Sequence, residues 1–480
     1  MPPIERGWIT FFVDRIFGWW SGLPRETSSY TTEFIQIPVN DVKLAANLYQ
    51  PTSPPRGTIL IRTSYGIAPL MALGNARMFA SRGYQVLLAA CRGTDPSDGQ
   101  ELVPAVYEAQ DGLATVAWMR EQPWYTGSFA TYGGSYLGHT QWAILTDPPE
   151  DMKAAVISTG PVDFGSFTWG TGAMETHMIA WAALMTAPKR GITPGLPYIR
   201  KLPTVLQPVY DSLPLMDVEQ GAPAFLTIGP WSHLGSQRGP TLIEALQFFD
   251  HYLAGQASAP RTSPCRVFVT GSNEWRDLPN WPPLASSTLS LYLSPRTLSK
   301  VQPEQASSSS FTFNPNNATP AIGMPRPFDD VQPTNYNDTE LANRSDVVVF
   351  DTPPLESDVE VCGKPSIELH HNTDNPHADI LVRLSEVNSK GKFRRISDVY
   401  KRLDPARGPE PLSLALVDCA HVFRKGSKIR VIIAGGAHPA YLRNLGTGEN
   451  QAYGTRTEPA VHTIHHSKDA VSRLTLPVTA

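Results

Sequence analysis

The sequence changes character once, near residue 260, and this change constrains the fold more than any other feature. Before it, short apolar runs alternate with helical stretches; after it, strand-like runs follow one another directly. Uninterrupted apolar runs of this length suit strands that are buried on both faces. Their alternation with helices predicts a mainly parallel, doubly wound α/β sheet over residues 1–258. The runs are TILIR (58–62), YQVLLAAC (84–91), SFATYGG (128–134), AAVIST (154–159) and AFLTIG (224–229).

The second part, residues 259–480, has the pattern of an all-β domain. Regular short strands without helices between them predict a β-sandwich of the jelly-roll type. Residues 301–330, rich in Ser, Pro and Asn, predict a long loop. Two domains also agree with the length of 480 residues, which is too long for one ordinary domain. An alternative is that residues 301–480 form an independent binding module.

Composition excludes several classes of partner. A net charge of −4 gives no electrostatic reason to expect a nucleic acid. The four cysteines lie far apart without metal-binding spacing, which favours free thiols. No apolar run reaches the ~18 residues of a membrane span. The stretch WITFFVDRIFGWWSGL (8–23) contains Asp14 and Arg15 and lacks a small-residue cleavage site, so we expect an amphipathic helix covering the body. We therefore expect a cytoplasmic protein without a membrane partner.

The segment TYGGSYLGHTQW (131–142) places Ser135 between a predicted strand and a predicted helix. This is the context of a nucleophile elbow, a sharp turn that presents the serine oxygen above the sheet edge. It also aims the next backbone N–H at a developing oxyanion. Gly133 fits the need for a small residue two positions before the serine, but the second glycine comes one position late, at Gly138, after Leu137. The pattern alone leaves open an ordinary strand–helix turn.

GGSYLGHTQW resembles the elbow of the cocaine esterase and X-prolyl dipeptidyl-peptidase family of serine hydrolases. Other stretches resemble this family in the same order along nearly the whole chain, and IGPWSH is the most specific of them. The resemblance implies an α/β-hydrolase domain followed by a jelly-roll domain, with no cofactor and no metal. The matching stretches are PVNDVKLAANLYQP (38–51), CRGTDPSDGQ (91–100), DGLATVAWMREQPW (111–124), IGPWSH (228–233), SNEWRDLPNWPP (272–283) and AHVFRKGSKIRVIIAGGAHPAYLRNLGTGE (420–449).

The resemblance also assigns roles around Ser135. His233 follows an apolar run, and a histidine placed there can reach back to the serine as general base and then general acid. The hydroxyl of Tyr65 and the backbone N–H of Tyr136 would form the oxyanion hole. For Tyr65 the alternative is a buried aromatic side chain that caps the sheet. Four other histidines are expected to have no catalytic role. We expect His139 to pack inside the protein, and His462, His465 and His466 to be surface or edge residues.

The family's catalytic triad also needs an acid that orients His233, and the sequence does not show this acid clearly. The family's usual Gly-Trp-Tyr-Asp context is absent, and only 98 positions separate Ser135 from His233, fewer than the family usually has. We therefore expect a reduced cap over about 161–200. Asp211 ends VLQPVYD and is the first candidate for the acid; Asp217 is the second, and a chain without a functional acid is the third possibility.

The sequence thus predicts a serine hydrolase that cleaves an ester or amide through an acyl-enzyme. A small ester or a short peptide with an N-terminal X-Pro dipeptide would be its substrate. Trp169 and Trp231 are candidates for lining an acyl pocket, with core packing as the alternative. A catalytically impaired family member that acts as a scaffold or binding protein is the competing hypothesis.

Overall fold

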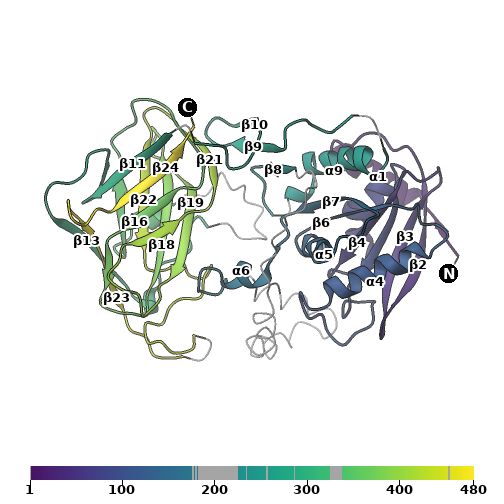
Figure 1. The fold of residues 1–480 in the computed structure, drawn as a ribbon, viewed down its shortest axis with the longest axis horizontal. Coiled ribbons are helices and arrows are strands. Elements are labelled where there is room, and N and C mark those ends of the chain that lie inside the picture. The colour runs from purple at the N-terminus through teal and green to yellow at the C-terminus, as the bar shows by residue number, and fades with distance from the viewer. Residues whose placement is uncertain are drawn as a thin grey trace. The chain divides into compact units, whose positions relative to one another are not determined.

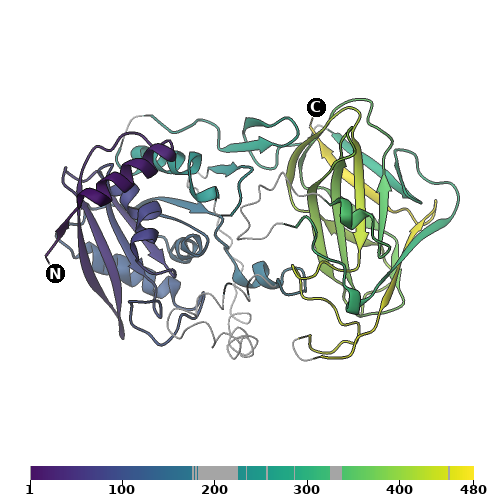
Figure 2. The same cartoon turned by 180° about the vertical axis from the view of Figure 1, so that it is seen from behind.

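The computed structural model describes residues 2–175, 178, 181, 225–233, 235–255, 258–285, 287–324, 338–451 and 454–479. These residues form two compact units, shown from opposite sides in Figures 1 and 2. The first unit takes in the described residues among 1–167, 178–220 and 233–262. The second takes in those among 168–177, 221–232 and 263–480.

The first unit is built on a sheet of seven described strands in the order β1-β2-β3-β5-β4-β6-β7. The hairpin of β2 and β3 is antiparallel, and β3 joins β5 antiparallel. β5, β4, β6 and β7 are parallel, as the uninterrupted apolar runs predict. The strands are β1 (Ile4–Glu5), β2 (Tyr30–Val39), β3 (Val42–Pro51), β4 (Thr58–Thr63), β5 (Gln85–Ala90), β6 (Phe129–Gly134) and β7 (Met152–Ser158).

Helices cover both faces of this sheet, so the predicted doubly wound α/β fold is confirmed. Along β4, Ile59 and Ile61 pack toward α3 and α9, whereas Leu60 between them packs toward α4 and α5. This alternation follows from the period of two in a strand. The helices are α1 (Trp8–Trp20), α2 (Pro69–Ala72), the π-helical turn η1 (Leu73–Arg77), α3 (Met78–Ala80), α4 (Glu108–Arg120), α5 (Tyr136–Leu145), the 3-10 turn η2 (Gly235–Gln237) and α9 (Pro240–Tyr252); α6 (Phe164–Trp169) ends in the second unit.

One predicted strand of the doubly wound sheet lies elsewhere. The run AFLTIG does form a strand, β8 (Leu226–Ile228), but β8 pairs in parallel with β9 (Cys265–Val269). With β10 (Glu274–Leu278) these strands make a separate three-stranded sheet in the second unit. An apolar run predicts that a strand forms but does not determine its neighbour, and this part of the prediction was wrong.

The rest of the second unit is all-β, as predicted. Its described strands form an eleven-stranded sheet and a three-stranded sheet, β13-β23-β17, with a large apolar core and a second, smaller apolar cluster that includes Leu381, Ile432 and Ala434. The eleven-stranded sheet includes β11 and β12, which precede residue 301, so residues 301–480 alone do not contain the whole sheet. The remaining elements are β11 (Ser287–Ser294), β12 (Thr297–Ser299), β13 (Ser307–Phe313), η3 (Pro315–Asn317), α10 (Thr339–Ala342), β14 (Val347–Asp351), β15 (Val359–Gly363), β16 (Ser366–Leu369), β17 (His371–Thr373), β18 (Asp379–Val387), β19 (Phe393–Arg402), β20 (Leu412–Ala415), β21 (Cys419–Phe423), β22 (Lys428–Ala434), β23 (Ala460–His466) and β24 (Arg473–Val478).

Two histidines of β23 correct a second expectation. His462 and His466 are fully buried, and only His465 between them is partly exposed. The strand lies between β13 and β17, and its period of two sends Ala460, His462, Ile464 and His466 to the same buried side. The expectation of surface or edge positions was therefore wrong for His462 and His466.

The N-terminal helix corrects a third expectation. α1 is amphipathic, and Phe17 packs on the core of the first unit, but most of its apolar side chains point outward: Trp8 is 74% exposed and Trp19 is 82% exposed, whereas Asp14 is fully buried. The helix therefore lies on the first unit with its larger apolar face turned away from it. Within the described ranges, no helix is both long and apolar enough to cross a membrane.

Candidate active site

Ser135 occupies the turn between β6 and α5, at the carboxyl end of a central parallel strand. Its backbone has φ 60° and ψ −128°, a conformation that non-glycine residues rarely adopt. The turn is held because the Ser135 N–H donates to the Ser158 carbonyl at 2.9 Å, and the Ser135 carbonyl accepts from Gly138 N–H at 2.9 Å. This strained strand–turn–helix geometry is that of a nucleophile elbow.

Two glycines make the turn possible. Gly133 has φ +149°, and a Cβ there would lie 2.4 Å from the Cβ of Leu137. A Cβ on Gly138 would lie 2.7 Å from the Cα of Gly160, so this glycine lets α5 approach the segment after β7. The displaced second glycine of the sequence pattern therefore has its own structural reason at position 138.

Tyr65 stands beside the serine. It follows β4, and its hydroxyl lies 3.0 Å from the Oγ of Ser135, within hydrogen-bond distance. Its backbone N–H donates to the Oγ1 of Thr63 at 2.9 Å. The indole N–H of Trp181 donates to the Tyr65 hydroxyl oxygen at 3.4 Å. The hydroxyl of Tyr65 thus points at the serine oxygen and is not enclosed in apolar packing alone.

Tyr136 begins α5, so helix geometry supplies no partner for its backbone N–H. Its side chain points into a buried cluster, stacked on Trp181 with ring centroids 5.5 Å apart, and its hydroxyl donates to Glu108. Glu108 is itself buried, and the loss of hydration raises the pKa of its carboxyl group. Sequence reasoning missed both Glu108 and Trp181; Glu108 lies just after CRGTDPSDGQ, but Trp181 has no local signal.

A series of hydrogen bonds ties the His233 loop to the same edge of the sheet. Ser158, whose carbonyl holds the Ser135 N–H, donates from its Oγ to the Ser236 carbonyl at 2.9 Å. The Oγ of Ser236 donates to the His233 carbonyl at 2.8 Å. Gln237, in the same 3-10 turn, packs so closely on β6 that a Cβ on Gly134 would lie 2.4 Å from its Cδ.

Burial lowers the pKa of the His233 imidazole below its ordinary value. A carboxylate near the ring would instead raise this pKa, because it stabilises the charged imidazolium. Both proposed acids, Asp211 and Asp217, lie outside the described residues, as does most of the predicted reduced cap over 161–200. The identity of the orienting acid therefore stays a prediction.

The remaining candidates are placed as follows. His139 is buried and its Nδ1 lies 3.1 Å from the Pro161 carbonyl, in agreement with a packing role. Trp231 packs on Trp275 in the second unit, with centroids 5.4 Å apart, and Trp169 ends α6 partly exposed. Their role as pocket residues stays a prediction. In the described part of the chain, no group of three or more His, Cys, Asp or Glu side chains could hold a metal ion.

Comparison with known proteins agrees with this geometry. The family model for X-Pro dipeptidyl-peptidase (S15 family) matches residues 40–207, and the model for the X-Pro dipeptidyl-peptidase C-terminal non-catalytic domain matches residues 258–475. The cocaine esterase of Rhodococcus sp. (strain MB1 Bresler) is 25% identical over 563 aligned positions that span 92% of this chain and 98% of the relative. Because the alignment is longer than the chain, this chain lacks many positions that the relative has.

Two solved structures share the fold over most of the chain. An aminopeptidase from a marine sediment Thaumarchaeota archaeon superposes with a TM-score of 0.75, at 19% identity over 94% of this chain and 97% of its own. An α-amino acid ester hydrolase superposes with a TM-score of 0.73, at 22% identity over the same shares of the two chains.

A serine in a strained elbow at the carboxyl edge of a doubly wound sheet defines an α/β-hydrolase, here with an all-β C-terminal domain. The two family models follow one another along the chain in that order. The chain belongs to the cocaine esterase and X-Pro dipeptidyl-peptidase family of serine hydrolases.

Proposed function

We propose that this hydrolase cleaves an ester or amide through an acyl-enzyme on Ser135. The observation that carries the proposal is the pairing of a strained elbow serine with the Tyr65 hydroxyl, 3.0 Å from its Oγ. A buried packing tyrosine would not need its oxygen at the serine. The attachment of the His233 loop to the Ser135 turn supports a base at the same edge.

The reaction proceeds in two halves. Ser135 Oγ attacks the substrate carbonyl carbon while His233 takes the hydroxyl proton, and the carbonyl oxygen becomes an alkoxide. The Tyr65 hydroxyl and the Tyr136 N–H donate to that oxygen. Collapse of this intermediate expels the leaving group, which receives the proton from His233. Water, deprotonated by His233, then attacks the acyl-enzyme carbonyl; collapse of this second intermediate breaks the bond between the acyl carbon and Ser135 Oγ, and His233 returns the proton to Oγ as the acid is released.

The substrate class is a small ester or a short peptide. The names of the relatives cover both chemistries: a cocaine esterase and an α-amino acid ester hydrolase on one side, an aminopeptidase on the other. We propose an ester or an N-terminal dipeptide amide as the bond that is cleaved, with Trp169 and Trp231 as candidates for its pocket.

Asp211 is our first candidate for the acid that orients His233, and Asp217 the second. Removal of the orienting acid can cost roughly 10⁴ in turnover while residual catalysis remains. We expect Asp211→Asn to lower kcat strongly and Asp217→Asn to leave it within a few-fold. Equal, small effects of both substitutions would contradict this assignment.

A fluorophosphonate probe tests the nucleophile, because it reacts covalently with an activated serine. We expect wild type to be labelled and Ser135→Ala to remain unlabelled, with Ser310→Ala, an exposed serine of β13 in the second unit, as the control that should be labelled as wild type is. A folded wild type without labelling would favour the second candidate, a catalytically impaired member. Among the residues that the structure describes, burial alone lowers the pKa of His233 and no carboxylate raises it, as a member without an orienting acid would show.

A further inference from the structure

The outer face of α1 is an uninterrupted apolar stripe. Figure 2 shows the helix running across the outside of the first unit. The stripe residues recur at helical spacing on one side of the helix, and all are exposed. Scattered exposed apolar residues are ordinary, but a continuous stripe of this kind marks an interaction surface. Its members are Trp8, Ile9, Phe12, Val13, Ile16, Trp19 and Trp20.

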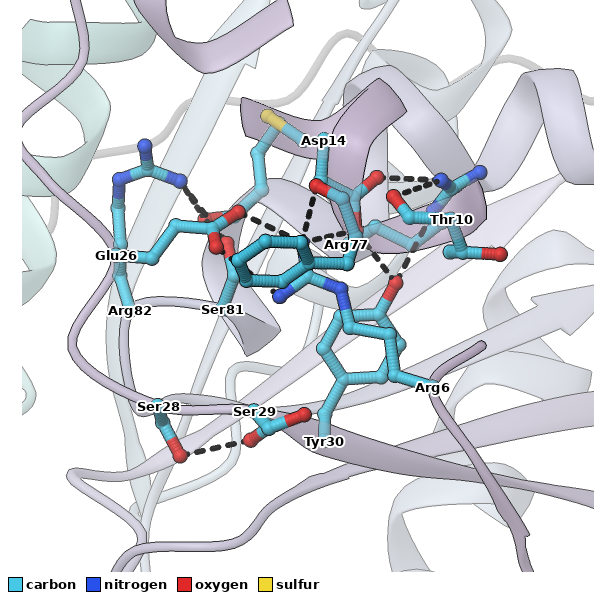
Figure 3. A network of polar contacts seen from close by, with 12 residues as sticks. Arg6, Thr10, Asp14, Glu26, Ser28, Ser29, Tyr30, Arg77, Ser81 and Arg82 are labelled. Carbon is cyan, nitrogen blue, oxygen red and sulfur yellow. Dashed lines mark hydrogen bonds and ion pairs between the residues drawn. The ribbon is translucent and has the colours of Figure 1, made fainter. Parts of the chain in front are cut away.

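The inner face of the same helix carries its only acidic residue, held in a buried ionic cluster (Figure 3). Asp14 contacts the guanidinium of Arg6 at 2.7 Å, forms an ion pair with Arg77, and accepts from the Tyr30 hydroxyl at 2.7 Å. Arg6 also pairs with Glu26 at 2.7 Å. Removing one partner from such a cluster leaves an uncompensated buried charge.

This cluster fixes the rotation of the helix. Arg77 also donates to the Thr10 carbonyl of α1, at 3.4 Å, and a Cβ on Gly18 would lie 2.8 Å from the guanidinium of Arg82. If α1 turned its apolar stripe inward, Asp14 would lose both arginines. The buried ionic contacts of Asp14 therefore determine that the apolar stripe faces outward; incomplete packing is not the reason.

The charges around the stripe favour an anionic surface. Asp14 and Glu26 are neutralised by their arginine partners, whereas Arg15 and Arg25 are exposed. Glu5, in β1, is the exposed acidic residue near the start of the helix. Arg15 is the only charged residue of α1 that faces water, because Asp14 is buried.

We propose that α1 docks this enzyme on a lipid–water interface that carries anionic headgroups. Tryptophans stand at both ends of the stripe, and indoles prefer the boundary between headgroups and acyl chains. Thirteen helical residues extend about 20 Å, shorter than the ~30 Å hydrocarbon core, so the helix lies in the interface plane. This departs from the expectation of no membrane partner, because composition does not show which side of a helix is buried.

Flotation with vesicles tests the proposal on the full chain. We expect wild type to float with phosphatidylcholine vesicles that contain phosphatidylserine, and to bind less as salt rises. The triple variant Trp8→Ser, Ile16→Ser, Trp19→Ser should lower the bound fraction about tenfold or more. Leu284→Ser removes an equally exposed apolar side chain from the second unit and should leave binding unchanged.

Three results would overturn the proposal. The first is a wild type that does not float with the vesicles that contain phosphatidylserine, or floats equally with vesicles of phosphatidylcholine alone. The second is a triple variant that binds as wild type does. The third is a dimer in sedimentation velocity that the triple variant dissociates, without vesicle binding, which would assign the stripe to a second copy of the chain. Fluorophosphonate labelling of the triple variant separates this result from a failure at Ser135, since the labelling should persist.

Discussion

At the scale of single residues, the site depends on hydroxyls brought together from two strands. Tyr65 follows β4 and Ser135 follows β6, and the parallel pairing of these strands puts both carboxyl ends at one edge. Brought together in this way, the two side chains approach at 3.0 Å although 70 positions separate them in the chain. The indole of Trp181 donates a hydrogen bond to the Tyr65 hydroxyl, and Glu108 accepts one from the Tyr136 hydroxyl.

Replacing Tyr65 by Phe removes the hydroxyl and keeps the ring. Loss of one oxyanion-hole donor costs about 10²–10³ in kcat, so we expect a fall of that size with little change in KM. The check is steady-state kinetics on an activated ester. Tyr125→Phe is the matched control, because its hydroxyl donates to Asp151 away from the serine. A Tyr65→Phe enzyme with undiminished kcat would contradict the oxyanion role.

The pH profile reports on His233. A general base must be neutral, and burial lowers the pKa of this imidazole below its ordinary value of about 6.5. We therefore expect kcat/KM to stay high as pH falls to about 6.5 and to decline only below it. An acidic limb centred above this value would instead indicate a carboxylate beside the ring in the working enzyme.

At the scale of elements, the elbow illustrates how one strand–turn–helix unit depends on small residues. We expect Gly133→Ala to reduce the free energy of unfolding by at least about 2 kcal/mol, because strain at φ +149° adds to a clash with Leu137. Gly127→Ala is the matched control, with φ +83° but open space, and should cost about 1 kcal/mol. Denaturant unfolding measures both. Equal losses would mean that the packing of Leu137 adds nothing.

The buried histidines of the second unit make its stability depend on pH. The Nε2 of His371 lies 3.0 Å from the Nδ1 of His462, and burial lowers the pKa of His371 to about 3 and that of His462 to about 4. Because the unfolded chain binds these protons near pH 6.5, the stabilisation is complete above that pH and is lost as pH falls toward 4. The loss near pH 5 is on the order of 2 kcal/mol per ring.

Calorimetry as a function of pH checks this expectation. His371→Gln should flatten the decline in Tm of the second unit between pH 7 and pH 5. A lower Tm at pH 7 would report lost packing, because the ring is neutral at that pH. An unchanged slope would show that these rings do not control acid stability.

At the scale of the whole molecule, the sequence predicted which helices, strands and domains follow one another better than it predicted which of them pack together. Apolar runs and turn residues identified the sheet strands β4 to β7, the elbow and the all-β second part, because strand burial and turn geometry are local properties. The partner of β8, the outward face of α1 and the buried face of β23 depend on tertiary neighbours, so local patterns could not determine them. The assignment of Asp211 as the orienting acid rests only on the short motif VLQPVYD, and no second feature of the sequence supports it.

Trapping of the acyl-enzyme tests the central claim most directly. Acid-quenched enzyme from a reaction with an activated ester is digested, and its peptides are weighed by mass spectrometry. The account predicts a mass increase equal to the acyl group on the peptide that contains Ser135, and none in Ser135→Ala. Ester turnover that persists in Ser135→Ala, with no acylated Ser135 peptide in wild type, would contradict it.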